Sequence, residues 1–328
     1  MKKPNVLMIS TDQHRADALG CYGNKVIRTP ALDKLCENGV KFTSAYVQNP
    51  LCMPSRACML TGRYPRINGC RLNGVPLPPA EITMPQVFAE NGYASAAIGK
   101  MHFMPSKAPY GFTYMKINDG LHFVDDRRDD YVEWIREEHP EILKNVMRDP
   151  NKTYRTDQYP FTSSIPEELH RVKWIADETI KFLRENRDNP FYCWMSFVEP
   201  HHPFTCPPPY SSMYRPEDMP LPLFREGELD ALPPHFMKMR KGLDDPAHAG
   251  KSDLSELSGR DWQNIKAHYY GMVSFVDTHV GRVLKSLEET GLLDNTIILF
   301  TSDHGELLGD HGLLFKGPFH YEGLIRIP

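Results

Sequence analysis

Asn5–Ser10 reads Asn-Val-Leu-Met-Ile-Ser, and Thr-Asp-Gln-His follows at positions 11–14. The short apolar run between polar ends predicts a strand that is buried on both faces, as in a parallel sheet. Ligands of such sheets bind beyond the carboxyl ends of the strands. The polar residues that follow this strand, Asp12 and Gln13 first among them, are therefore candidates for function.

The same alternation of apolar runs and amphipathic helices continues along the chain. Further strands are predicted at 40–47, 93–98, 191–198 and 295–302. Helices are predicted at 30–38, 83–92, 166–186 and 261–290. A repeated β-α-β order predicts an α/β fold with a mainly parallel (mixed) central sheet and helices on both faces. Four strand ends carry polar clusters and are expected to converge: Asp12-Gln13, Lys100 with His102, His201, and Asp303-His304.

Two segments interrupt this alternation. Residues 105–165 are highly charged with weak periodicity and one expected helix around 130–147, and residues 203–260 are rich in proline and predicted to be mostly loop. We interpret both as insertions at the pocket rim of a single catalytic domain spanning 1–328. These segments contain aromatic and basic residues that fit substrate contacts and ordinary packing equally well, such as Phe123, Arg127, Arg128 and Trp134. The sequence therefore does not identify the natural substrate.

Composition excludes several classes of protein. The net charge is −4, from 38 basic and 42 acidic residues, so no global positive field indicates nucleic acid. The apolar runs are too short to cross a bilayer, and the first is too short for a signal peptide. We therefore expect a cytoplasmic chain without a membrane partner. Seven cysteines without a Cys-x-x-Cys pair predict neither a zinc ribbon nor a disulfide framework. The oligomeric state is not predicted.

One cysteine has a distinctive setting. Asn49–Arg63 reads Asn-Pro-Leu-Cys-Met-Pro-Ser-Arg-Ala-Cys-Met-Leu-Thr-Gly-Arg. Pro54 suits the start of a helix, which places Cys52 at the amide-rich, positive end where anions bind and thiol pKa values fall. Arg56 follows one turn later on the same side.

The run Cys-x-Pro-Ser-Arg-x-x-x-Leu-Thr-Gly-Arg at 52–63 resembles the signature of the formylglycine-dependent sulfatases, in the alkaline-phosphatase superfamily. The resemblance implies an alkaline-phosphatase-like fold. It also implies that a formylglycine-generating maturation enzyme oxidises Cys52, and that the hydrated aldehyde is the nucleophile. Family members usually continue beyond Ile327-Pro328, so a smaller C-terminal subdomain is expected to be absent.

The resemblance also assigns a metal site. Asp12, Gln13, Asp303 and His304, together with modified Cys52, match the positions that bind one divalent cation in the family. Calcium is the family default, but an imidazole ligand suits manganese better, which makes manganese a close second. Gln13 and His304 replace the aspartate and asparagine of many sulfatases and look more like phosphonate monoester hydrolases. A His304 that only forms hydrogen bonds is the alternative.

The remaining catalytic roles are likewise implied by the resemblance. Arg56 would stabilise the attacking oxygen, Lys100 and Lys316 would neutralise the sulfuryl oxygens, and His201 or Lys316 would protonate the leaving alcohol. The enzyme would be left as a covalent sulfate ester, and His102 would then take a proton from the second hydroxyl to release sulfate. Candidate substrate-binding residues are Asn73, Lys100, His201 and Lys316. Asn73 fits a turn residue before Gly74 equally well.

The sequence therefore predicts a sulfuric-ester hydrolase acting on a small-molecule sulfate monoester. Lys100 and His102 favour this reading. A phosphonate monoester or phosphodiester hydrolase with the same nucleophile is one alternative, and an inactive truncated fragment is another.

Overall fold

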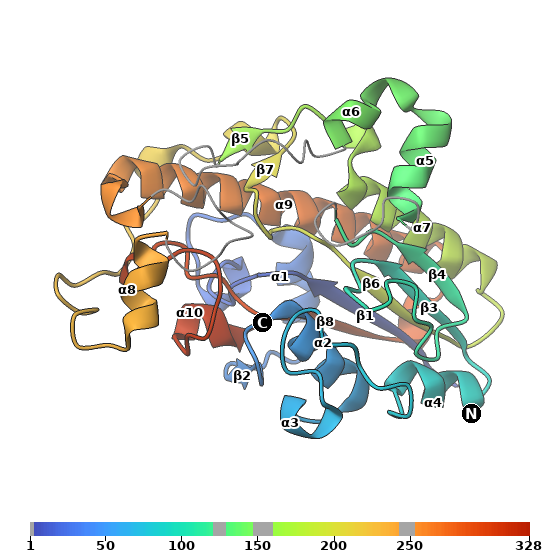
Figure 1. Ribbon diagram of the computed structural model, residues 1–328. Coiled ribbons are helices and arrows are strands. Elements are labelled where there is room, and N and C mark those ends of the chain that lie inside the picture. The colour runs from blue at the N-terminus through green and yellow to red at the C-terminus, as the bar shows by residue number, and fades with distance from the viewer. Residues whose placement is uncertain (1–2, 121–128, 147–159, 243–252) are drawn as a thin grey trace.

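The computed structural model describes residues 3–120, 129–146, 160–242 and 253–328. At its centre lies a five-stranded sheet in the order β4-β3-β6-β1-β8, and every pairing within it is parallel. The strands are β1 (Asn5–Thr11), β3 (Ala94–Gly99), β4 (Tyr114–Ile117), β6 (Phe191–Ser196) and β8 (Thr296–Ser302). The predicted α/β fold with a mainly parallel sheet is confirmed (Figure 1).

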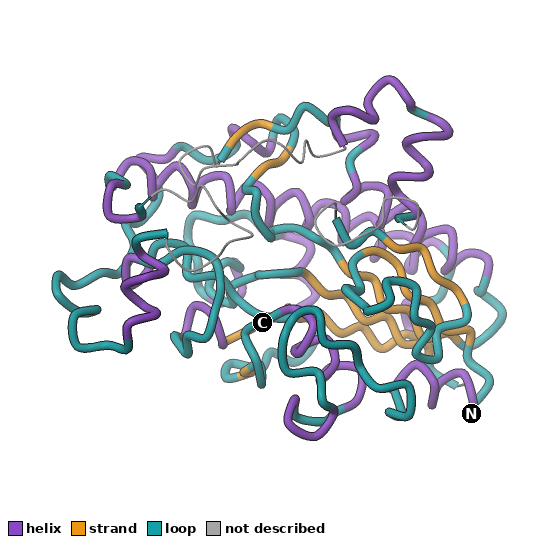
Figure 2. Tube along the Cα trace, in the orientation of Figure 1, coloured by secondary structure: helices purple, strands orange, loops and turns teal. Residues whose placement is uncertain are grey.

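Helices cover both faces of the sheet, as predicted, and Figure 2 shows the strands as the layer between them. The helices are α1 (Pro30–Glu37), α2 (Cys52–Thr61), α3 (Pro65–Asn68), α4 (Met84–Glu90), α5 (Asp130–Glu138), α6 (Leu143–Val146), α7 (Arg171–Glu185), α8 (Pro234–Arg240), α9 (Gly259–Glu289) and α10 (Glu322–Ile325). Two short pairs lie outside the central sheet: β2 (Ala45–Tyr46) with β9 (Arg326–Ile327), and β5 (Phe161–Thr162) with β7 (Thr205–Cys206).

The alternation of side chains along the strands divides the core in two. Cys193 of β6 packs in the cluster formed with α1, α7 and α9, whereas Trp194 packs with α2 and α4 on the opposite face. This period of two is the pleat of a strand that is buried on both sides. At 31 residues α9 is the longest helix of the described chain, yet no helix there has the length and apolar character that crossing a bilayer requires.

Strand register brings the functional positions together. Thr11 pairs with Ser302 and Ser10 pairs with Ser196, so β1, β8 and β6 end at the same level. Gly99 of β3 also pairs with Ser196. The residues that follow these strands consequently emerge along one edge of the sheet.

Three details of the predicted elements are wrong. The strand expected at 40–47 is only β2, which pairs antiparallel with β9, and Val40 is 82% exposed. The segment 105–165 contains β4, the edge strand of the central sheet, so it is more than a loop insertion. Its helix divides at Pro140 into α5 and α6. Position 147 and the candidates Phe123, Arg127 and Arg128 lie outside the described residues.

The strand at 295–302 was also predicted to be buried. β8 instead forms the other edge of the sheet, and Ile297 is 51% exposed. An apolar run of this length does not distinguish a central strand from an edge strand whose outer side chains remain accessible.

The start of α7 makes folding sensitive to acid. The buried His170 ring accepts a hydrogen bond through Nδ1 from Val172 N at 3.3 Å, and burial lowers its pKa from 6.5 to about 4. The unfolded ring binds a proton below pH 6.5, whereas the folded ring does so only near pH 4. This contribution to stability is therefore complete above pH 6.5 and is lost as the pH falls toward 4.

We expect His170→Asn, which keeps a cap acceptor, to reduce this acid sensitivity. Between pH 7.5 and pH 5 the wild type should lose about 2 kcal/mol of unfolding free energy through this ring, and the variant should not. Urea unfolding of both proteins at the two pH values measures the difference. The buried rings of His14 and His279 are common to both proteins and cancel. Equal losses in the two proteins would contradict the assignment.

Candidate active site

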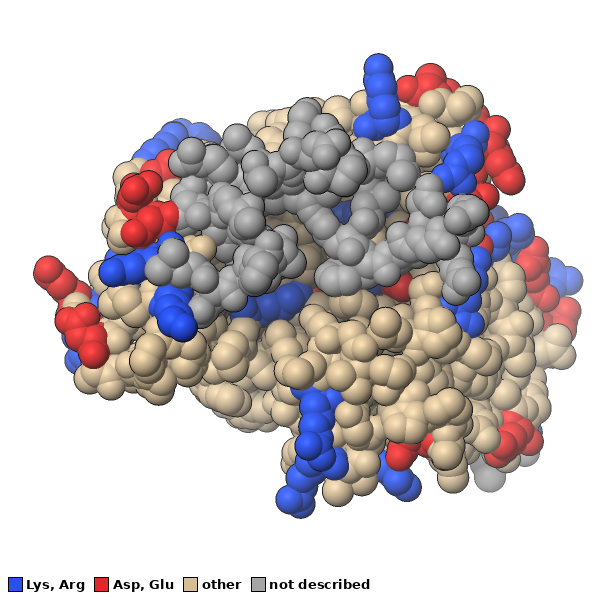
Figure 3. Space-filling view, viewed as in Figure 1, with Lys and Arg blue, Asp and Glu red and all other residues tan. Residues whose placement is uncertain are grey.

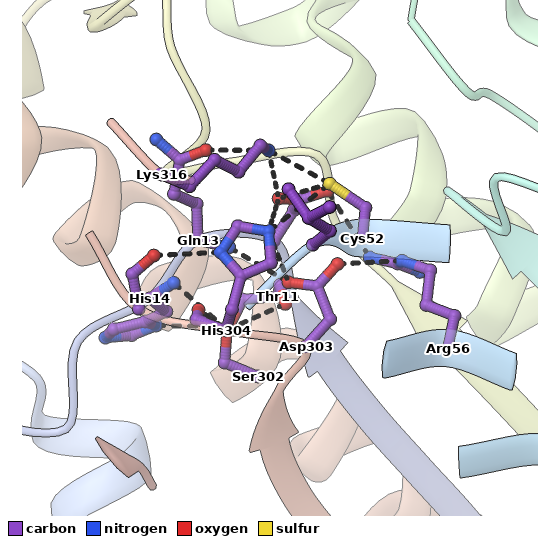
Figure 4. A network of polar contacts seen from close by, with 12 residues as sticks. Thr11, Gln13, His14, Cys52, Arg56, Ser302, Asp303, His304 and Lys316 are labelled. Carbon is purple, nitrogen blue, oxygen red and sulfur yellow. Dashed lines mark hydrogen bonds and ion pairs between the residues drawn. The ribbon is translucent and has the colours of Figure 1, made fainter. Parts of the chain in front are cut away.

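Cys52 lies in the first turn of α2, buried at the carboxyl edge of the sheet (Figure 4). Its Sγ is 2.9 Å from Lys316 Nζ, 3.3 Å from His304 Nε2 and 3.7 Å from Asp12 Oδ1. Burial and Asp12 raise the thiol pKa, but Lys316, His304 and Lys100 outweigh them and hold the pKa of Cys52 well below its usual value. The predicted lowering is confirmed in direction, with side-chain cations as its cause.

Arg56, one turn further along α2, joins the carboxylates that follow β1 and β8. Its Nε donates to Asp303 Oδ2 at 2.8 Å, and its Nη2 lies 3.6 Å from Asp12 Oδ2. Nη1 donates to the carbonyl oxygen of Lys100 and to Ser196 Oγ at 2.9 Å. These contacts involve all three guanidinium nitrogens, and Arg56 is only 1% exposed. Arg56 therefore fixes the positions of the two acids.

Lys100 approaches Asp12 from the end of β3. Its Nζ lies 2.6 Å from Asp12 Oδ2 in an ion pair that is nearly inaccessible to solvent. Burial would raise the pKa of Asp12, but Lys100, Lys316 and nearby imidazoles hold it well below its usual value. Gly99 permits this approach: its φ is +93°, and a Cβ there would lie 2.0 Å from the carbonyl oxygen of Ser196.

The cluster has the donor set of a metal site. One ligand atom from each of Asp12, Cys52, Asp303 and His304 lies within 4.8 Å of the others, and all four residues are buried. His304 Nδ1 is 2.8 Å from the carbonyl oxygen of Gly305, which can only accept, so Nδ1 carries a hydrogen and donates this hydrogen bond. In the neutral ring this leaves the lone pair of Nε2 facing the cluster, as in metal-binding histidines. Two carboxylates and an oriented imidazole fit a divalent cation.

Gln13 lies beside this cluster with a left-handed backbone, φ +67°. Its Oε1 accepts a hydrogen bond from Lys316 Nζ at 2.9 Å, and its Nε2 donates to Glu306. Glu306 is fully buried, and sequence reasoning missed it. The only signal for it in the sequence was a carboxylate two residues after His304. Its role could not be inferred, because its hydrogen-bond partner Gln13 lies 293 positions away in the sequence.

His201 follows β6 and is buried near the same charges. Its Nδ1 is 2.6 Å from the carbonyl oxygen of His202, and the two rings stack with centroids 4.1 Å apart. Burial, Lys316, His202 and Lys100 hold the pKa of His201 well below its usual value, so the ring is neutral. His202 turns toward Gln13 instead, with 3.3 Å between Nδ1 and Gln13 Nε2.

The structure places the two remaining candidates at the margin of the cluster. His102 is buried, has φ +55° and borders a small cavity with Met53 and Arg56. Its backbone N–H donates to Asp119 Oδ1 at 2.7 Å. Asn73 Oδ1 accepts a hydrogen bond from Met53 N at 3.1 Å and so caps the start of α2 beside Cys52. The substrate contact predicted for Asn73 stays a prediction.

The surface around the site mixes charges of both signs. On the face in Figure 3, basic and acidic side chains lie mainly around the periphery of the described surface, with uncharged residues between them. The charged cluster described above lies in the interior, at the ends of β1, β3 and β8.

Comparison with known proteins agrees with this geometry. The sulfatase family model matches residues 4–328. The arylsulfatase of Clostridium perfringens (strain 13 / Type A) is 36% identical, over 99% of this chain and 68% of that protein. The multifunctional alkaline phosphatase superfamily protein PehA of Trinickia caryophylli is 31% identical, over 100% and 68%. The crystal structure of a phosphonate monoester hydrolase of Agrobacterium radiobacter superposes with a TM-score of 0.83 at 29% identity, covering 99% of this chain and 67% of that one.

The fold and the charged cluster at its carboxyl edge define a hydrolase of the alkaline-phosphatase superfamily. Within that superfamily the chain belongs to the sulfatase family and is a sulfuric-ester hydrolase, as the motif at Cys52 indicated. It spans about two-thirds of the length of the three relatives described above.

The buried position of Arg56 predicts a large effect on stability. Arg56→Met leaves the Asp303 carboxylate without its nearest cation, and we expect the unfolding free energy to fall by about 3–5 kcal/mol. Arg63→Met, in the loop that follows α2, removes a half-exposed arginine 3.5 Å from Glu81 and should cost less than about 1 kcal/mol. Denaturant unfolding of both variants measures this difference. Similar losses would show that Arg56 does not hold the acids in place.

Proposed function

We propose that this protein hydrolyses a sulfate monoester with a nucleophile formed at position 52 by conversion of Cys52 to formylglycine. The observation that carries the proposal is the convergence on Cys52 Sγ of Lys316, His304 and Asp12, each within 3.7 Å. A hydrated aldehyde in place of the thiol would present oxygen to the same groups. Because maturation needs a separate enzyme, a formylglycine-generating partner belongs to the proposal.

A divalent cation completes the proposed site, held by Asp12, Gln13, Asp303 and His304 together with the modified residue 52. When bound, the cation supplies Lewis-acid polarisation of an oxygen and orients the reacting groups. The carboxylate and amide oxygens suit calcium, whereas the His304 nitrogen suits manganese. We therefore propose one divalent cation, with both metals to be compared.

Lys316 is the better candidate for proton donor to the leaving alcohol. Burial lowers its pKa, but in the unmodified chain Cys52, Asp12 and Asp303 outweigh burial and raise it. Asp12 and Asp303 remain after Cys52 is converted and continue to favour the protonated Nζ. His201 is neutral, and its Nδ1 proton is directed to the carbonyl oxygen of His202. A neutral ring whose proton is already donated is a poor acid.

The remaining charged groups act as fixed electrostatic partners, Lys100 of the sulfuryl oxygens and Arg56 of the attacking oxygen. Lys100 is pre-positioned by Asp12, and Arg56 is held by Asp303, so neither cation needs to reorganise during the reaction. Over one turnover the ester oxygen takes a proton and leaves as the alcohol, while water supplies the oxygen that completes sulfate. His102 remains the proposed base for the second half of this cycle.

Phosphonate monoester hydrolysis is the second candidate, favoured by Gln13, His304 and the similarity to the Agrobacterium radiobacter structure. The deciding measurement is kcat/KM for an aryl sulfate against the matching aryl phosphonate monoester, on matured protein with manganese or calcium. We expect sulfate to be preferred. A preference for the phosphonate would overturn the proposed substrate class.

Lys316→Met tests the proposed proton donor. Loss of one preorganised donor should lower kcat for aryl sulfates by roughly 10²–10³-fold. If Nζ protonates the leaving oxygen, the loss should be larger for phenyl sulfate than for 4-nitrophenyl sulfate, because the nitrophenolate leaves without a proton. Rates of both substrates are measured for wild type and variant.

The matched control is His201→Asn, which keeps a polar group at the other candidate position. Its loss of activity should be similar for the two sulfates. A leaving-group dependence that appears in His201→Asn and not in Lys316→Met would reverse the assignment.

A further inference from the structure

We infer that Glu306 is a positioning residue that holds the Gln13 amide with its oxygen toward the metal site. The inference rests on the proposed function in one respect, because Gln13 Oε1 is taken as a metal ligand. Glu306 itself would not touch the metal or the substrate. Its contribution would be to select one of the two orientations of the Gln13 side-chain amide, whose oxygen and nitrogen are similar in size.

The backbone of Gln13 is already fixed without Glu306. Its N–H donates to Asp303 Oδ1 at 3.1 Å, and its carbonyl oxygen accepts from the Tyr269 hydroxyl at 2.7 Å. Its left-handed φ of +67° is one that a non-glycine residue keeps only where its surroundings enforce it. The remaining freedom is the rotation of the side-chain amide, which places either Oε1 or Nε2 toward Lys316.

Glu306 selects between these two orientations. Its Oε2 accepts a hydrogen bond from Gln13 Nε2, and a carboxylate can only accept. His202 Nδ1 lies 3.3 Å from the same nitrogen and accepts from it in the tautomer that is protonated at Nε2. The amide oxygen is therefore directed to Lys316 Nζ at 2.9 Å, and the same Nζ contacts Cys52 Sγ of the metal cluster. In the opposite orientation the Gln13 NH₂ group would face the Lys316 ammonium, so that two donors would oppose each other. Gln13 Oε1 would then face Glu306 Oε2 and, in the same tautomer, His202 Nδ1, neither of which would have a donor.

The other oxygen of Glu306 anchors the segment that carries Lys316. Oε1 accepts backbone hydrogen bonds from Leu308 at 3.0 Å and from Phe315, the residue before Lys316. Both oxygens of a fully buried side chain are thus used, one for the loop and one for Gln13. Groups that orient metal ligands from outside the coordination sphere typically affect metal affinity 10–100-fold when changed.

Glu306→Gln separates these two uses. Its amide oxygen can still accept from Leu308 and Phe315, but its NH₂ then faces Gln13 Nε2. Gln13 must rotate, which turns its own NH₂ toward Lys316 and the metal. We expect the dissociation constant for manganese alone to rise roughly ten- to hundredfold, measured by calorimetric titration of the full, chelator-stripped chain.

A second background keeps the test decisive if this variant folds poorly. In Gln13→Glu two carboxylates oppose each other, and adding Glu306→Gln restores a donor and an acceptor. Glu306→Gln should therefore weaken manganese binding in the wild-type background and strengthen it in the Gln13→Glu background. A purely structural residue would act in the same direction in both backgrounds.

The matched control is Asp277→Asn. Asp277 is also buried and accepts two backbone hydrogen bonds, from Ala31 and Leu32 at 3.1 and 2.8 Å, away from the site. This variant should lower Tm without changing the dissociation constant. If the wild type binds manganese and Glu306→Gln lowers only Tm, or weakens binding equally in both backgrounds, the inference about Glu306 is overturned. A wild type that binds neither manganese nor calcium would overturn the proposed metal site, and the inference with it.

Discussion

The site depends on one buried guanidinium. Arg56 reaches from α2 to Asp303 after β8, Asp12 after β1, the Lys100 carbonyl after β3 and Ser196 at the end of β6. A planar group with five fixed donors can join four strand ends in this way, and lysine cannot. Without it, two carboxylates would be brought together at the edge of a parallel sheet with less compensation. The helix that presents Cys52 is held in register with the sheet by the same contact.

Charge balance explains why such a cluster can be buried. With Cys52 as a thiolate, the three anions Asp12, Asp303 and Cys52 face the cations Arg56, Lys100 and Lys316 in the interior, together with the His304 imidazole. Burial lowers the pKa of this imidazole, but Asp303 and Cys52 raise it above its usual value. Conversion of Cys52 to an uncharged hydrate would remove one anion and leave the cluster positive, and a divalent cation would increase that charge. The matured site would then attract an anionic ester, whereas the unmodified thiolate is already neutralised by Lys316. In the proposed function, maturation therefore supplies the nucleophile and also frees positive charge for the substrate.

Most of the scaffold could be predicted because its signals are local. The apolar runs that became β1, β3 and β6 are buried on both faces, and a short apolar run with polar ends identifies such strands. β4 was missed because Tyr114–Ile117 has only four residues, and three of them remain partly exposed. Val40 and Phe42 show the opposite failure, since β propensity without a pairing partner does not make a strand.

At the site, the acids and cations near Cys52 were recognisable from one contiguous motif and from strand ends. Glu306 was not, because its role depends on a contact with Gln13 that only the folded chain creates.

Sulfate and phosphonate monoesters differ little in charge, so electrostatics alone separates them weakly. Both are monoanions, but a sulfate monoester has three non-bridging oxygens besides its ester oxygen, while a phosphonate monoester has carbon in place of one of those three. Discrimination must therefore come from what faces that third substituent: a hydrogen-bond donor favours oxygen, and an apolar surface favours carbon, because a buried donor left unpaired is costly. The ammonium groups of Lys100 and Lys316 both approach Asp12, at 2.6 and 3.7 Å, from elements on either side of it. In the proposed function these two ammonium groups would act as donors to the non-bridging oxygens of a sulfuryl group.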